Sequence, residues 1–203
     1  NPITIEMLGT GKNIPDEIAN DDIYYNRIES SGNSTKAMRN FHNLYVKFKL
    51  IYGVSKPGNT LVDLAVGMGG DIPKWIKSKL SFVLGIDKSE DNIENRAIGA
   101  CARYLNFRKD FQIMPNALFI RGDSSNNLKN GDGLYNEKGK MIMNAVFGKG
   151  SKDKDKIGAG VYKNYGKAVD GFQITSCQFA LHYFFENIQS LSSFLRNVSE
   201  MTK

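Results

Sequence analysis

The sequence has few of the residues that cross-link a fold or hold a metal ion. Only two cysteines, Cys101 and Cys177, and two histidines occur among 203 residues, and they are scattered along the chain. Two separated cysteines predict free thiols in a reducing compartment rather than a disulfide framework. No grouping of these residues has the spacing of a metal site, so we expect no metal centre.

The sequence also lacks long apolar runs. None approaches the length that crosses a membrane, and no secretory signal is visible. We therefore expect an intracellular protein that makes no membrane contact. The first residue is Asn1, which suggests a piece cut from a longer polypeptide. The net charge of +6 is modest, but it favours an anionic partner such as nucleic acid.

The order of predicted elements is typical of a parallel α/β sheet. Residues 1–35 have few periodic apolar residues and are predicted to form an irregular amino-terminal arm, followed by one domain over 36–203. Within that domain, predicted strands alternate with predicted helices, as in parallel α/β proteins. The strands are predicted at 60–65, 82–87, 117–121 and 171–177, and the helices at 36–52, 71–80, 91–105 and 187–200.

The segment between the third and fourth predicted strands is long and rich in Gly, Lys and Asn. It is predicted to contain one short helix or strand pair around 140–147, then a mobile basic loop at about 148–170. The stretch from residue 149 to residue 167 contains six lysines but only two aspartates. One hypothesis is that this loop contacts RNA phosphates, and a solvated loop without a partner is an equally good interpretation.

The stretch LVDLAVGMGGDIPKW, residues 61–75, predicts a strand that ends in a glycine turn and leads into a helix. Gly67 and Gly69 allow a tight turn and close approach of a ligand to the main chain. Asp87 ends the second strand, 20 positions after Gly67, where doubly wound folds place the acid that binds a ribose. Asp123 follows the third strand, and it can also be a simple turn residue or helix cap.

Carboxylates around the turn discriminate between two kinds of nucleoside ligand. Asp63 and Asp71 flank the glycines. A diphosphate would be repelled by these charges, whereas a sulfonium and an ammonium would be attracted. The pattern therefore favours S-adenosylmethionine over a dinucleotide, and a methyltransferase over a dehydrogenase.

Four segments resemble motifs of the mRNA cap guanine-N7 methyltransferases. The glycine stretch resembles their first motif, GIDKSEDNIENRAIGACARY their second, FIRGDSS their adenine-contact segment and QFALHYFFEN their cap-pocket signature. The preceding RNFHNLYVKFKLI is similar to their first helix. The resemblance covers about residue 36 to the end, and it is similar to the methyltransferase region of multidomain capping enzymes of large DNA viruses. It implies a Rossmann-like class I S-adenosylmethionine-dependent methyltransferase fold.

The resemblance also implies site residues. Lys47 would meet the carboxylate of S-adenosylmethionine, Asp87 its ribose, and Asp123 with Ser124 its adenine. Most lysines are merely solvated, and an aromatic residue after a strand is usually core, so these alternatives stay open for Lys47 and Phe179. The implied cofactor-binding residues are Lys47, Asp63, Ala65, Gly67, Gly69, Asp71, Asp87, Asp123, Ser124 and Gln178, and the implied cap-binding residues are Arg103, Phe179, His182 and Tyr183.

The implied reaction moves a methyl group to N7 of the 5′-terminal guanosine cap. Because N7 carries a lone pair and no proton, the reaction needs orientation but no general base, metal or covalent intermediate. Capped RNA and other capping domains, a triphosphatase and a guanylyltransferase, are the implied partners. If the protein is viral, a virion or a cytoplasmic virus factory is its expected location.

Two alternatives remain: a non-catalytic RNA-binding or scaffold domain with the same fold, and an RNA methyltransferase acting at another position. Four strands are predicted where the family's sheet has seven. We therefore expect carboxy-terminal strands to be missing and the chain alone to methylate capped RNA slowly.

Overall fold

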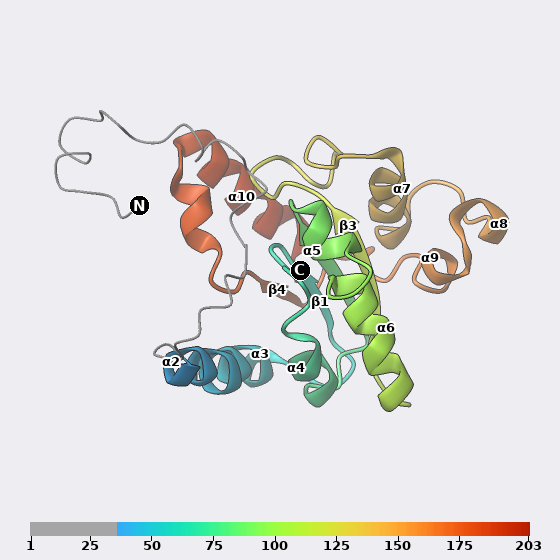
Figure 1. Ribbon diagram of the computed structural model, residues 1–203. Coiled ribbons are helices and arrows are strands. Elements are labelled where there is room, and N and C mark those ends of the chain that lie inside the picture. The colour runs from blue at the N-terminus through green and yellow to red at the C-terminus, as the bar shows by residue number, and fades with distance from the viewer. Residues whose placement is uncertain (1–35) are drawn as a thin grey trace. The chain divides into compact units, whose positions relative to one another are not determined.

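A four-stranded parallel sheet forms the centre of the protein, as predicted (Figure 1). The computed structural model describes residues 36–203, and the predicted arm at 1–35 lies outside the described residues. The strand order is β3-β2-β1-β4, so β1 and β2 are the inner strands, and because all pairings are parallel, every strand ends at the same edge. The strands are β1 (Thr60–Asp63), β2 (Phe82–Asp87), β3 (Asn116–Arg121) and β4 (Ile174–Ser176).

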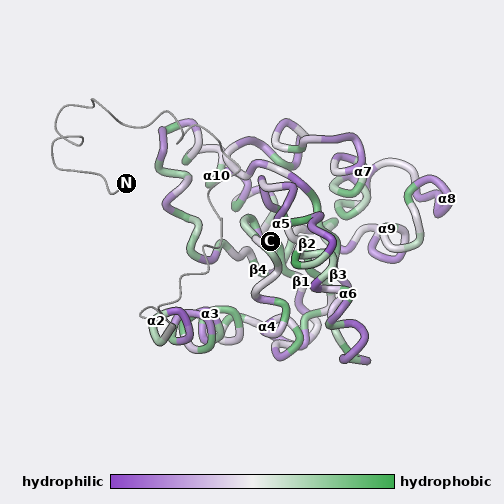
Figure 2. Tube along the Cα trace, viewed as in Figure 1, coloured by the Kyte–Doolittle hydropathy of each residue, from purple (hydrophilic) through white to green (hydrophobic). Residues whose placement is uncertain are grey.

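Side chains of successive strand residues enter two separate cores, one on each face of the sheet. Val62 and Leu84 pack with helices α7 (Glu137–Val146) and α10 (Ile188–Met201). Leu61 and Val83 pack with α3 (Lys47–Val54), α4 (Ile72–Lys77) and α6 (Ala100–Asp110). Figure 2 shows this apolar centre in green, surrounded by more hydrophilic helices. Trp75 is fully buried in the second of these cores.

The predicted helix at 36–52 is helical, but it is not one regular α-helix. It consists of α2 (Lys36–Asn40), a π-helical turn η3 (Phe41–Val46) and α3. Its apolar periodicity is misleading, because Ile51 is buried while Met38, Phe41, Leu44 and Tyr45 are each at least half exposed.

The predicted helix at 91–105 is two helices, α5 (Glu90–Glu94) and α6, with a turn between them. The side chain of Asn95 accepts hydrogen bonds from the backbone N–H groups of Ala97 and Ile98, which ends α5. Gly99 is required there, because a Cβ atom on it would lie 2.7 Å from the backbone of Asn95. Ser89 caps the start of α5, since its hydroxyl accepts a hydrogen bond from Asn92 N at 3.3 Å.

The segment at 148–170, predicted as a mobile loop, contains two short helices. After α7, the segment forms α8 (Lys154–Ile157) and α9 (Ala159–Lys163). Ile157, Val161 and Ala168 are buried in the same core as α7, and they anchor the segment. Because the segment is rich in lysine and glycine and its apolar residues are widely spaced, the sequence did not indicate that these residues are buried.

The chain after α10 returns to the sheet. Thr202 forms a parallel bridge with Phe172, two residues before β4. Within residues 36–203, no helix is long and apolar enough to cross a membrane. Cys101 and Cys177 are free and half-buried.

Candidate functional site

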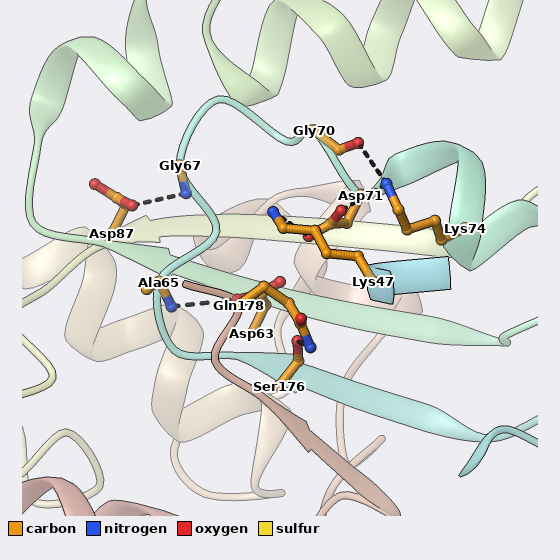
Figure 3. Close-up of polar contacts among 10 residues, drawn as sticks. All are labelled: Lys47, Asp63, Ala65, Gly67, Gly70, Asp71, Lys74, Asp87, Ser176 and Gln178. Atoms are coloured by element: carbon orange, nitrogen blue, oxygen red, sulfur yellow. Dashed lines mark hydrogen bonds and ion pairs between the residues drawn. The ribbon is translucent and has the colours of Figure 1, made fainter. Parts of the chain in front are cut away.

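The glycine turn after β1 is held in shape by a carboxylate from β2. Gly67 and Gly69 have φ angles of 54° and 70°, a left-handed conformation that glycine adopts without strain. The N–H of Gly67 donates to Oδ2 of Asp87 at 2.7 Å (Figure 3). A Cβ atom on Gly69 would lie 2.8 Å from the Ile72 side chain and 3.4 Å from Ala100 Cα. The turn therefore packs closely against the first turns of α4 and α6.

Asp87 is more heavily engaged than its sequence position indicates. Its second oxygen, Oδ1, accepts from the backbone N–H of Ser89 and from the side-chain amide of Asn92, both at 3.0 Å. A carboxylate has about four lone-pair sites for hydrogen bonds. Three of them are used by these contacts, so one site is left for a ligand. Asn92, which is buried, was missed by the sequence reasoning, although it lies in the first turn of a predicted helix.

Asp63 is a buried acid at the end of β1 with no ion-pair partner among the described residues. Burial, and next the negative charge of Asp71, raise the pKa of the Asp63 carboxyl from its ordinary 3.8 to about 7. The N–H of Ala65, which donates to Asp63 Oδ1 at 3.2 Å, and the Lys47 ammonium act in the opposite direction. A bound cation would favour the ionised form of this group, and a bound anion would oppose it.

Asp71 stands between two lysines from different helices. Lys74 Nζ lies 2.7 Å from Asp71 Oδ1, and Lys47 Nζ lies 3.4 Å from Oδ2. Lys74 also donates to Gly70 O at 3.3 Å and is buried (Figure 3). The sequence reasoning missed Lys74, although a spacing of three residues from Asp71 on a helix was a usable signal. The solvated interpretation of Lys47 is wrong, because its side chain is 15% exposed and ion-paired.

Asp123 and Ser124 lie beyond the end of β3, beside the ends of β1 and β2. Asp123 Oδ1 accepts from the N–H of Ser125 at 2.8 Å, and its Oδ2 lies 3.7 Å from Lys88 Nζ. Asp123 is thus a turn residue as well as a candidate ligand group. The buried hydroxyl of Ser124 donates to Leu64 O at 2.7 Å, which fastens this loop to the end of β1.

The residues after β4 bring a second set of side chains to the same edge. Gln178 follows Ser176, the residue of β4 that pairs with Asp63, and its amide donates to Ser176 Oγ at 3.4 Å (Figure 3). Cys177 is close enough to Asp63 to be affected by its charge. Burial first, and this charge second, raise the pKa of the Cys177 thiol to about 12, so it is not a nucleophile at neutral pH.

Phe179 is not a core residue, although the core interpretation was open. The residue is 49% exposed, whereas Phe184 is buried and stacks on Phe194. Its φ angle is 60°, a conformation that costs a residue with a Cβ atom about 1–2 kcal/mol. The Phe179 ring lies 5.1 Å from the His42 ring, and Lys47 Nζ lies 5.2 Å from its centroid. His42 was missed because no local pattern connects η3 with the end of β4.

His182 and Tyr183 follow on a short 3-10 helix, η4 (Leu181–Phe185). Their rings are 4.0 Å apart and tilted by 47°, and His182 is exposed. Phe179 is tied to the glycine-turn edge through Lys47, and His182 and Tyr183 follow it in the chain.

Arg103 and the basic segment at 149–167 are not parts of one surface. Arg103 lies on α6, one turn after Ala100, on the face of the sheet that α3 and α4 cover. The basic segment packs with α7 on the other face. Arg103 and the basic segment would therefore contact different parts of a bound RNA.

Comparisons with known proteins agree with this arrangement. A family model described as "mRNA (guanine-N(7))-methyltransferase domain" matches residues 20–203. The chain is 27% identical over 218 residues to a "Probable mRNA-capping enzyme" of Acanthamoeba polyphaga mimivirus, a match that covers 100% of this chain and 17% of that protein. It is 28% identical to the "mRNA cap guanine-N(7) methyltransferase" of Saccharomyces cerevisiae, in a match that covers 89% of this chain and 33% of that protein.

The chain thus spans between about a sixth and somewhat under half of the length of the curated relatives it matches. Among solved structures, the YcgJ protein of Bacillus subtilis aligns with a TM-score of 0.44 and 14% identity, over 80% of this chain and 46% of that one. That likeness is too slight to carry an argument.

Proposed function

Because the chain belongs to the mRNA (guanine-N(7))-methyltransferase family, with its Rossmann-like class I fold, we propose that it methylates N7 of the 5′-terminal guanosine of capped RNA. The observation that carries the proposal is the shared strand edge. There the glycine turn and Asp63 of β1 lie beside the exposed aromatic segment that follows β4.

The site fits S-adenosylmethionine better than a phosphate-bearing cofactor. Asp63 is a buried acid without an ion pair among the described residues, and the nearby charge of Asp71 makes its ionisation still less favourable. The sulfonium and ammonium of S-adenosylmethionine would relieve this repulsion, and a diphosphate would increase it.

The chain's own groups suggest how the cofactor is oriented. Lys47 would meet its carboxylate, while keeping the ion pair with Asp71. The free lone pair of Asp87 would accept one ribose hydroxyl, since its other sites hold the turn. Asp123, after β3, would lie toward the adenine. When bound, S-adenosylmethionine supplies a methyl group on a sulfonium, which is a good leaving group.

The remaining task of the protein is to aim N7 of guanine at that methyl group. N7 presents a lone pair, so no side chain needs to remove a proton. Holding two reactants in line at near-attack distance is worth roughly 7–11 kcal/mol. We assign this positioning to Phe179, His182 and Tyr183, with Arg103 toward the cap phosphates. We also infer that the protein acts inside cells, next to other domains of a capping enzyme, as the name of the mimivirus relative suggests.

The test combines calorimetry with S-adenosylmethionine and a methyl-transfer assay on a capped dinucleotide, followed by mapping of the methylated atom. We expect binding, and the methyl group on N7. Asp87→Asn should weaken cofactor binding about 10- to 150-fold, as expected for one lost hydrogen bond to a charged group. Asp110→Asn, the same change at an exposed residue at the end of α6, is the matched control.

Two results would contradict the proposal. Methylation of another atom would support the alternative that the protein is an RNA methyltransferase acting at a position other than N7. Absence of S-adenosylmethionine binding, with RNA binding retained, would support the non-catalytic alternative.

A further inference from the structure

The lysines between residues 149 and 167 lie on a folded segment at one end of the sheet. We call this segment, residues 149–167, the platform. This segment contains six lysines and two aspartates, a net charge of +4, while the whole chain carries +6. All six lysines are exposed, and one ion pair is formed with the aspartates, Lys156 with Asp153 at 3.8 Å. The lysines are Lys149, Lys152, Lys154, Lys156, Lys163 and Lys167.

The platform is fixed by its own packing. Ile157 and Val161 are buried, the N–H groups of Gly166 and Ala168 bond to the carbonyls of Ala145 and Val146, and the buried Asn164 donates to Gly160 O. A fixed platform holds its charges in place before a ligand arrives, which lowers the entropy cost of binding.

The location of the platform excludes direct contact with the cap. It joins the carboxy-terminal end of α7, where the Phe147 ring lies 5.9 Å from the ring of Phe172, two residues before β4. The glycine turn and Phe179 lie at the opposite edge, where the strands end. α7 connects the two edges, and its ten residues span about 15 Å. Figure 1 likewise draws α8 and α9 across the sheet from α3, which carries Lys47.

We propose that the segment 149–167 is a second contact surface, which binds the phosphate backbone of the RNA downstream of the cap. The inference rests on the proposed function, because that function supplies an RNA chain that continues beyond the cap site. A single strand fits better than a duplex, because Tyr162 is 40% exposed among the lysines and its ring offers a base a surface for stacking.

The test measures binding of the full chain to an uncapped single-stranded RNA of roughly 20 nucleotides, longer than typical site sizes of about 4–16. The variant Lys154→Gln/Lys163→Gln/Lys167→Gln keeps most of each side chain and removes three charges. We expect roughly 10- to 100-fold weaker binding at about 0.1 M salt, and a slope of log affinity against log salt that is shallower by about 2. Tyr162→Leu should give a smaller loss with an unchanged slope.

A matched control makes the same change at three exposed lysines elsewhere. The variant Lys56→Gln/Lys77→Gln/Lys109→Gln removes equal charge from a turn and from the ends of α4 and α6. We expect it to keep the affinity and slope of the unaltered chain. An equal loss in both triple variants, or none in the first, would overturn the proposal. So would binding to anionic phosphatidylserine vesicles that depends on Lys154, Lys163 and Lys167 while RNA binding does not.

A second readout separates this inference from the proposed function. Methylation of a capped dinucleotide, which is too short to reach the platform, should be unchanged in the first triple variant. If the unaltered chain does not methylate the dinucleotide but the triple variant still loses RNA affinity, the proposed function fails and the RNA surface stands. If methylation occurs and RNA affinity is insensitive to the three lysines, the surface fails alone.

Discussion

The ends of β1 and β4 lie side by side, yet they are built in opposite ways. After β1, Asp71 and Lys74 are buried and ion-paired, and the half-buried Asp87 at the end of β2 holds the glycine turn by a hydrogen bond. After β4, the aromatic residues Phe179, His182 and Phe185 are exposed, and Phe179 has a strained backbone. The first region is set before a ligand arrives, whereas the second has large apolar surface that a ligand can cover.

Lys47 connects the two regions. Its ammonium pairs with Asp71 on one side and lies over the Phe179 ring on the other. Changes in the β1 region should therefore alter stability and cofactor binding together, while changes in the β4 region should alter substrate binding with little effect on stability.

The largest expected effect is on the buried ion pairs. Asp71→Asn leaves the buried Lys74 without a counter-charge, and it should lower the free energy of unfolding by about 3–5 kcal/mol. Urea denaturation measures this. The double variant Asp71→Asn/Lys74→Met, which removes both charges, should recover at least half of the loss. A single-variant change below about 1 kcal/mol would show that the pair is not effectively buried.

Replacing Asp63 is expected to raise the free energy of unfolding, where replacing Asp71 lowers it. The Asp63 pKa is about 7 in the folded protein and 3.8 ordinarily, so the folded state holds the proton more tightly. The tighter proton binding stabilises the folded state. This contribution is complete below pH 3.8 and is lost as the pH rises through 7. Asp63→Asn should therefore raise the free energy of unfolding at pH 8 by at most about 4 kcal/mol, with the gain vanishing toward about pH 4.

Cofactor affinity supplies the control for that variant. In the unaltered chain, the affinity for S-adenosylmethionine should rise with pH up to about 7 and then level off, because the ionised acid attracts the cation. The Asp63→Asn variant should bind weakly at every pH, since it has no charge to offer. If stability rises without a loss of affinity, Asp63 does not face the ligand.

The smallest expected effect on stability is at Phe179, in the region after β4. Phe179→Gly and Phe179→Ala remove the same ring, but only glycine accepts a φ of 60° freely, so the glycine variant should be about 1 kcal/mol more stable than the alanine variant. Both should raise KM for the capped dinucleotide and leave the affinity for S-adenosylmethionine unchanged. Equal loss of cofactor affinity in the two variants would remove the distinction between the regions.

The sequence by itself determined the strands, their parallel order and the glycine turn. These follow from local signals: buried-type runs such as 82–87, glycines at 67 and 69, and acids that follow strand ends. Since parallel strands end at one edge, Asp63, Asp87 and Asp123 could be placed together without coordinates. Helix ends were partly predictable, as at Ser89, where capping is local.

Only the tertiary structure decided which groups are paired and which surfaces are separate. Asp63 and Asp71 look alike in the sequence, but Asp71 has two lysines while burial raises the pKa of Asp63. The contact of His42 with Phe179 joins residues 137 positions apart, which no periodicity encodes. Likewise, burial of Ile157 and Val161 against α7 folds a lysine-rich segment and fixes it at the far edge of the sheet. Such packing depends on long-range contacts, and a local pattern does not contain them.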